Sequence, residues 1–186
     1  MSAIEIAAAV FGVLYIVLAV KAISWCWPFG IFSAILYIVF DIQLSYFLDA
    51  ILQTYYVFAG FYGWYLWTRN SDDKTNEAGI TSYSMKKILP FLILGSLLTP
   101  ALGYMFSKIG NAYPYIDSFT AVFSFIATYF TAKKILDSWH IWMVVDLILV
   151  VQYFLKDAYV TSGFYFFLTL MAVYGYFEWR KQIRTV

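Results

Sequence analysis

Seven stretches of this chain are apolar over about 17 to 25 residues, the length that an α-helix needs to cross the hydrocarbon core of a membrane. They cover residues 4–20, 25–40, 46–67, 88–107, 115–131, 139–155 and 159–179. A water-soluble domain is about half apolar and about a quarter charged, whereas this sequence is 63% apolar and 12% charged. We therefore predict an all-α integral membrane protein with seven transmembrane helices.

Lysine and arginine residues fall almost entirely on one side of these predicted spans. Seven spans place the connections after the first, third and fifth on the same side as the C-terminus. That side carries Lys21, Arg69, Lys74, Lys86, Lys87, Lys133, Lys134, Arg180, Lys181 and Arg184, and the other side carries Lys108 and Lys156. Because short loops rich in Lys and Arg stay in the cytoplasm, we expect the N-terminus outside and the C-terminus in the cytoplasm.

A short aromatic motif occurs twice, at residues 62–69 and 174–181, in the form Tyr-Gly-aromatic-aromatic-x-Trp-x-basic. Both copies end a predicted span on the basic side, so the two halves of the chain run parallel about an axis along the membrane normal. This predicts a 3+1+3 arrangement of the SWEET type. Its three parts are a first three-helix bundle, a cytoplasmic loop with a linker helix, and a second three-helix bundle, over residues 1–67, 68–114 and 115–186. The alternative is chance recurrence in a chain that is 23% aromatic.

One acidic residue, Asp146, interrupts the apolar run 139–155 near its middle. An Asp at the centre of a membrane span costs about 2.5 to 3.5 kcal/mol on the insertion scale, so it needs a reason to be there. Trp142 and Trp139 lie four and seven residues earlier, within about 60° of the same helix face. A carboxylate beside two indole rings suits a flat organic cation. The alternative is that Asp146 caps a kink or pairs with Lys156.

A polar stripe runs along the third predicted span, where spacings of four, three and four residues separate Asp49, Gln53, Tyr56 and Gly60. Gln53 is deep enough in the span that its amide must face the interior of the bundle. There it either contacts a ligand or makes a structural hydrogen bond, and the sequence leaves both open. Tyr56 is a candidate for the same site.

Other chemistries find little support in the sequence. The one cysteine, Cys26, excludes an intrachain disulfide and a cysteine-based metal cluster, and we expect neither a metal nor a cofactor. The basic residues do not form a patch for nucleic acid. A membrane enzyme or sensor remains as a rival, with the single histidine, His140, near Ser138 and Asp137, but no nucleophile motif accompanies them.

Several of these segments together resemble the PnuC family of bacterial vitamin transporters. They are Trp139-x-x-Trp142-x-x-x-Asp146, the motif at 62–67, the segments 42–44 and 52–53, and the segment 29–31. The resemblance covers nearly the whole chain. It implies an inner-membrane protein with the 3+1+3 fold, a homotrimer, and facilitated diffusion of an unphosphorylated vitamin that a cytosolic kinase then traps.

The resemblance also implies which residues contact the substrate, namely Trp139, Trp142, Asp146 and Gln53. Family members for nicotinamide riboside typically carry Asn where this chain has Asp146, and Asp there is associated with the thiamine-type members called PnuT. Thiamine has a ring cation and an amino group that donates to a carboxylate. We therefore expect thiamine as the substrate, with nicotinamide riboside as the alternative.

Overall fold

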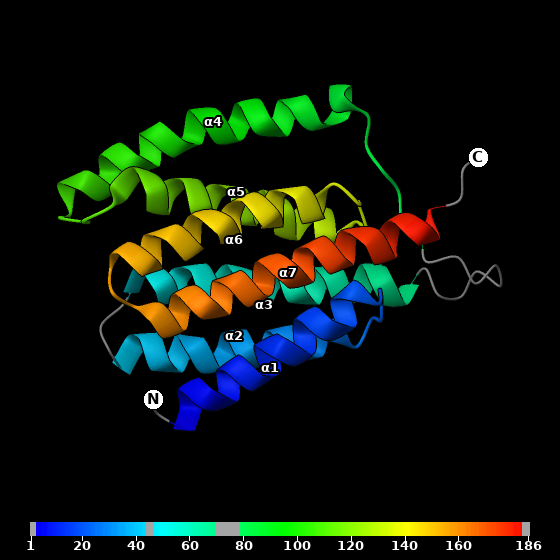
Figure 1. Ribbon diagram of the computed structural model, residues 1–186, viewed down its shortest axis with the longest axis horizontal. Coiled ribbons are helices and arrows are strands. Elements are labelled where there is room, and N and C mark those ends of the chain that lie inside the picture. The colour runs from blue at the N-terminus through cyan, green and yellow to red at the C-terminus, as the bar shows by residue number, and fades with distance from the viewer. Residues whose placement is uncertain (1–2, 44–46, 70–78, 184–186) are drawn as a thin grey trace.

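The protein is an all-α bundle, seen in a computed structural model that describes residues 3–43, 47–69 and 79–183. Its described part contains seven helices, which coincide with the seven apolar runs (Figure 1). They are α1 (Ala3–Val20), α2 (Cys26–Gln43), α3 (Phe47–Arg69), α4 (Met85–Lys108), α5 (Pro114–Ala132), α6 (Ser138–Leu155) and α7 (Tyr159–Gln182). Most of the predicted loop after α3, residues 70–78, lies outside the described part.

Four of these helices, α2, α4, α6 and α7, are long and apolar enough to cross a membrane by length and composition alone. In α1, residues 4–20 form a shorter apolar helix. The helix α5 is more polar, and its buried hydroxyl side chains are Ser118, Thr120, Ser124, Thr128 and Thr131. Since α5 packs against α3, α4 and α6, these hydroxyl groups face protein rather than lipid, which explains how a central helix tolerates them.

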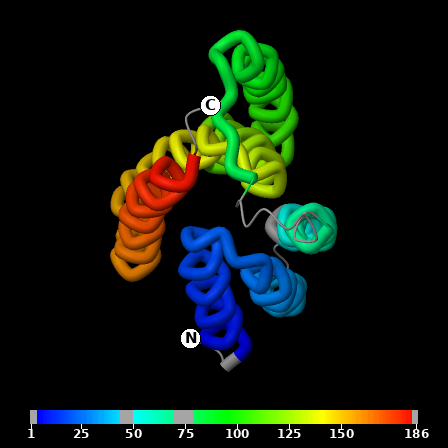
Figure 2. The backbone as a smooth tube through the Cα atoms, turned by 90° about the vertical axis from the view of Figure 1, so that its right-hand side faces the viewer, coloured from blue at the N-terminus to red at the C-terminus, as the bar shows by residue number. Residues whose placement is uncertain are grey.

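The helices form two sets of three that meet in a ring. Within the first set α2 packs between α1 and α3, and within the second α6 packs between α5 and α7. Contacts of α3 with α5 and of α1 with α7 join the two sets. Among the described helices α4 packs against α5 alone, on the outside of the ring (Figure 2).

The turns after α1 and α5 have the same backbone geometry. Ala22 and Lys134 have positive φ angles of 55° and 52°. The amide of the following residue donates to a carbonyl five residues earlier, at 3.0 Å after α1 and 2.9 Å after α5. This hydrogen bond closes a helix with a left-handed residue and satisfies a terminal carbonyl. Both turns lie at the end of the bundle where α3 and α7 also end (Figure 1), which we call the basic end.

The chain entering α4 is fastened to the turn between α5 and α6. The Thr81 amide donates to the Lys134 carbonyl at 3.0 Å, and the Leu136 amide donates to the Thr81 carbonyl at 2.8 Å. The Asp137 carboxylate accepts from the Tyr83 amide at 2.9 Å. These bonds fix where α4 begins, although among the described helices α4 packs against α5 alone.

Four tryptophans form the core of the basic end, two from each three-helix set. The rings of Trp27 and Trp67 meet edge to face at 5.4 Å and 86°, and those of Trp139 and Trp179 do so at 5.2 Å and 84°. Trp67 also lies 6.0 Å from Trp179 across the interface between the sets. All four side chains are almost fully buried. We call this group the tryptophan cluster.

Two hydrogen bonds with equivalent partners cross between the sets beside this cluster. Trp67, at the end of α3, donates its indole N–H to the carbonyl of Ala132 at 3.0 Å, at the end of α5. Trp179, at the end of α7, donates to the carbonyl of Ala19 at 3.1 Å, at the end of α1. Each set therefore binds a helix end of the other through a tryptophan of the repeated motif.

Candidate functional site

Asp146 lies midway along α6 and is 5% exposed. Its carboxylate makes no hydrogen bond or ion pair with any residue that the structure describes. The suggested partner Lys156 instead lies over the rings of Tyr113 and Tyr153, at 4.5 and 5.3 Å. Burying a carboxylate without such a partner costs free energy, and an acidic residue at this depth is therefore a candidate for a ligand site or a transport path.

Two tyrosines lie near enough to this carboxylate to interact with it electrostatically. Asp146 interacts electrostatically with Tyr56 on α3 and with Tyr165 on α7, and both tyrosines are half-buried. Tyr56 in turn interacts with Ser124 on α5 and with Tyr15 on α1. Polar groups from five helices thus converge around the middle of the bundle, which is where an organic cation with hydrogen-bonding groups would find partners.

Trp142 lies one helical turn from Asp146 towards the basic end. Its indole is half-buried, and its Nε1–H donates to the hydroxyl of Thr131 on α5 at 3.2 Å. That hydroxyl donates in turn to the carbonyl of Ala127 at 2.9 Å. The indole of Trp142 is therefore held against α5 while part of its surface remains accessible.

Trp139 and Gln53, the other two predicted contacts, have different surroundings in the structure. Trp139 is 1% exposed and belongs to the tryptophan cluster, so its ring is covered by protein in this conformation. Gln53 is half-buried on α3, one turn before Tyr56, and has no hydrogen bond to another described side chain. Asp146, Tyr56 and Trp142 therefore form the centre of the candidate site.

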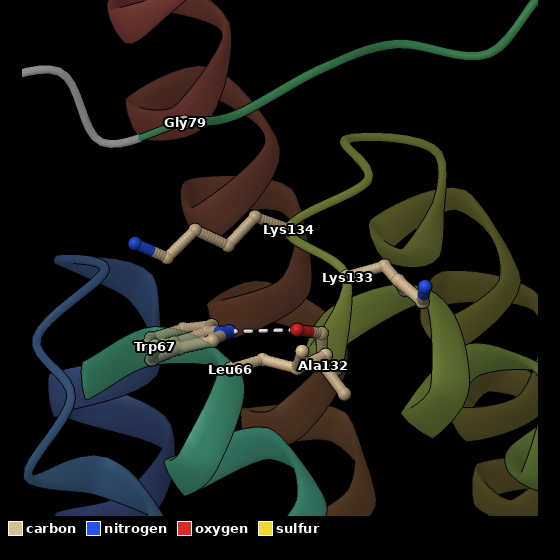
Figure 3. A pocket seen from close by; sticks show the side chains of 6 residues that line it. All are labelled: Leu66, Trp67, Gly79, Ala132, Lys133 and Lys134. Atoms are coloured by element: carbon tan, nitrogen blue, oxygen red, sulfur yellow. Dashed lines mark hydrogen bonds between the residues drawn. The ribbon is translucent and has the colours of Figure 1, made fainter. Parts of the chain in front are cut away.

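A separate cavity of about 170 Å³ opens at the basic end. Its lining residues are Leu66, Trp67, Gly79, Ala132, Lys133 and Lys134 (Figure 3). The ammonium of Lys134 lies 4.8 Å from the Trp67 ring, and burial lowers the pKa of this amine from its usual value. The cavity's charged lining residues are two lysines, which would repel a cation. The two lysine side chains point away from each other, so they do not converge on a single anion either.

Residues 2–181 of the chain match the family described as "Nicotinamide mononucleotide transporter". The chain belongs to this family. The nicotinamide riboside transporter PnuC of Escherichia coli (strain K12) is 24% identical over 181 residues, which cover 84% of this chain and 76% of that protein. The expected membership of the PnuC family is thereby confirmed.

Two further comparisons extend the likeness within the family. The riboflavin/roseoflavin transporter RibM of Streptomyces davaonensis is 23% identical over 180 residues, covering 94% of this chain and 83% of RibM. A solved structure of the vitamin B3 transporter PnuC superposes with a TM-score of 0.77 at 21% identity, covering 96% of this chain and 81% of that one. The PnuC-family fold therefore extends over almost the whole of this protein.

Membership of the PnuC family makes this protein a membrane transporter and removes the enzyme rival. The three residues that suggested an enzyme, Asp137, Ser138 and His140, do not form a catalytic arrangement in the structure. Asp137 accepts hydrogen bonds from Ser82 and Tyr83, and Ser138 is fully buried. His140 lies on the surface, 3.8 Å from Asp137 and with its ring 4.6 Å from that of Tyr176.

Sequence reasoning missed several members of the site in this PnuC-family protein. Tyr165 lies in the middle of an apolar helix, and Tyr15 lies in the first span, where each reads as one aromatic among many. Ser124 and Thr131 lie on α5, seven residues apart, with Thr128 between them. Hydroxyl groups at spacings of four and three on one face were the signal that could have identified this helix as central.

Proposed function

We propose that this protein takes up a flat cationic vitamin across the bacterial inner membrane by facilitated diffusion, with thiamine as its substrate. The observation that carries the proposal is the buried Asp146 carboxylate, which makes no hydrogen bond or ion pair with the described residues. A permanent ring cation or the donating amino group of thiamine supplies the missing partner. Trp142 on the same helix, and Tyr56 and Gln53 on α3, complete the proposed site.

Nicotinamide riboside is the second candidate substrate. It is favoured by the names of the Escherichia coli relative and of the solved vitamin B3 transporter. It also carries a permanent ring cation, so Asp146 and Trp142 serve it by the same chemistry. The relative RibM is named for riboflavin. The fold therefore does not determine the substrate, and the residues of the site must.

The paired features of the two helix sets support a 3+1+3, SWEET-like architecture with α4 as the linker. The Trp-to-carbonyl bonds, the Trp–Trp pairs and the left-handed residues of the turns all recur in both sets. In this architecture transport proceeds by motion of one set against the other. We further propose a homotrimer and trapping of the vitamin by a cytosolic kinase, as in the family that this chain resembles.

In this conformation the tryptophan cluster closes the basic end, which we assign to the cytoplasm. Release of the vitamin there requires Trp67 and Trp179 to separate and their two cross-set hydrogen bonds to break. That motion also exposes Trp139, which can then contact the substrate, as expected from its position on the same helix face as Asp146. The carboxylate of Asp146 and the cluster therefore act at successive points of one path.

A binding titration on detergent-purified protein tests the substrate, with thiamine, nicotinamide riboside and riboflavin as ligands. Riboflavin is the control, because its ring is flat but carries no permanent cation. We expect thiamine to bind most tightly and riboflavin least. Tight binding of riboflavin with no binding of either cation would overturn the role of Asp146.

Liposomes that enclose a thiamine kinase and ATP test transport. We expect labelled thiamine to accumulate as the phosphate inside these liposomes, and to equilibrate unmodified in liposomes that lack the kinase. Accumulation above the external concentration without kinase and ATP would contradict facilitated diffusion.

A further inference from the structure

The hydrogen bond from Trp142 to Thr131 fixes how the indole of Trp142 faces the site. An indole has a single N–H donor, and the Thr131 hydroxyl accepts it at 3.2 Å. Thr131 is 2% exposed, and its own hydroxyl hydrogen goes to the carbonyl of Ala127 at 2.9 Å. Both polar functions of the pair are therefore used before any ligand arrives.

We propose that Thr131 is a positioning residue for substrate binding, acting through Trp142, and that Trp142 recognises the substrate through its ring face alone. This inference rests on the proposed function, since it concerns the same site. With its N–H directed into α5, Trp142 has no donor left to offer a ligand. What remains accessible is the π surface, which attracts a cation regardless of the other groups on its ring.

In this assignment Trp142 and Asp146, one turn apart on α6, have different roles in binding. Trp142 contributes affinity that is nearly the same for every flat cation of similar size. Asp146 contributes discrimination, because a carboxylate distinguishes ligands by the hydrogen bonds they donate. Loss of Thr131 should therefore weaken different cationic vitamins by a similar factor and leave their ratio unchanged.

The helix α5 offers a matched control for this idea. Thr128 lies one turn before Thr131, is equally buried, and also donates to a carbonyl four residues earlier, at 2.8 Å. It accepts no hydrogen bond from Trp142. Thr128→Val and Thr131→Val therefore remove the same kind of group from the same helix, but only Thr131→Val leaves an indole N–H without its acceptor.

Titrations with thiamine and nicotinamide riboside separate these variants. We expect Thr131→Val to weaken both ligands by about three- to tenfold, the scale of one neutral hydrogen bond. Thr131→Ser, which keeps the hydroxyl, and Thr128→Val should bind as wild type does. In a Trp142→Phe background, Thr131→Val should have no further effect. Equal binding by wild type and Thr131→Val, or equal losses in Thr131→Val and Thr128→Val, would overturn the proposal.

A second measurement needs no ligand. In protein labelled with ¹⁵N at its seven tryptophans, the indole N–H signal of Trp142 is identified by its absence in Trp142→Phe. Thr131→Val should shift this signal and Thr128→Val should leave it in place, and an unmoved signal in Thr131→Val would reject the hydrogen bond. Wild-type protein that binds neither vitamin would reject the proposed function instead, so the two failures are distinct.

Discussion

Trp179 donates its indole N–H to the carbonyl oxygen of Ala19 at 3.1 Å, and so binds the last helix of the bundle to the first across 160 residues of sequence. The same arrangement joins Trp67 to Ala132 between α3 and α5. Helix ends leave carbonyl groups without partners inside the helix. Trp67 supplies such a donor to Ala132, and Trp179 adds a second donor to Ala19, whose carbonyl also accepts from the Ala22 amide at 2.9 Å. The contact between the helix sets at the basic end thus depends on a few directional bonds as well as on packing.

Replacing either tryptophan by Phe should destabilise the protein. Trp179→Phe and Trp67→Phe keep an aromatic ring but remove a buried hydrogen bond between the helix sets, so we expect each to lower the free energy of unfolding by about 1 to 3 kcal/mol. Thermal unfolding in detergent measures this. Trp25→Phe is the control, because Trp25 is 64% exposed at the same end. An equal loss for Trp25→Phe would show that the cross-set bonds contribute nothing particular.

Glycine is required where a helix backbone meets a tryptophan ring. A Cβ atom on Gly175 would lie 2.7 Å from the Trp139 ring, and one on Gly63 would lie closer still to Trp27. Gly175→Ala and Gly63→Ala should each reduce stability by about 1 to 3 kcal/mol through overpacking. Gly163→Ala, on the same helix as Gly175, has open space and should be neutral or slightly stabilising. If all three variants have the same free energy of unfolding, the close approach of the tryptophan rings is not the reason for glycine at these positions.

Asp146→Asn separates a functional carboxylate from a structural one. Asn keeps the size and part of the hydrogen bonding, so the protein should fold and stay monodisperse. Thiamine binding should weaken by at least about 1 kcal/mol, the scale of a charge-assisted hydrogen bond, and nicotinamide riboside should lose less or gain. Titration of both ligands checks this, and monodisperse Asp146→Asn protein that binds thiamine as wild type does would refute the assignment.

The two ends of α4 test the orientation of the protein in the membrane. Lys86 and Lys108 are both exposed near opposite ends of this helix, and the native Cys26 is buried. In intact cells, a maleimide that cannot cross the membrane should label Lys108→Cys and spare Lys86→Cys. After the membrane is permeabilised, both should react. The reverse pattern in intact cells would mean that the basic end faces outward.

Much of the fold could be predicted from local sequence. A helix is closed by hydrogen bonds between residues four apart, so an apolar run of the right length reports it directly. The run 115–131 became α5 (Pro114–Ala132), and the run 88–107 became the longer α4 (Met85–Lys108). Asp146 could be selected for the same reason, because one charge in an apolar helix is conspicuous without knowledge of its neighbours.

Only the tertiary structure decided which side chains meet. Trp139 and Trp142 share a helix face in the sequence, yet Trp139 packs into the tryptophan cluster whereas Trp142 donates to Thr131 on α5. Likewise, nothing local marks Tyr165 as a neighbour of Asp146. In water an apolar stripe identifies the inner face of a helix, but here lipid and protein interior are equally apolar, so hydrophobicity does not distinguish them. The inner faces of these helices are set by close packing and by single hydrogen bonds, which depend on partners far away in the chain.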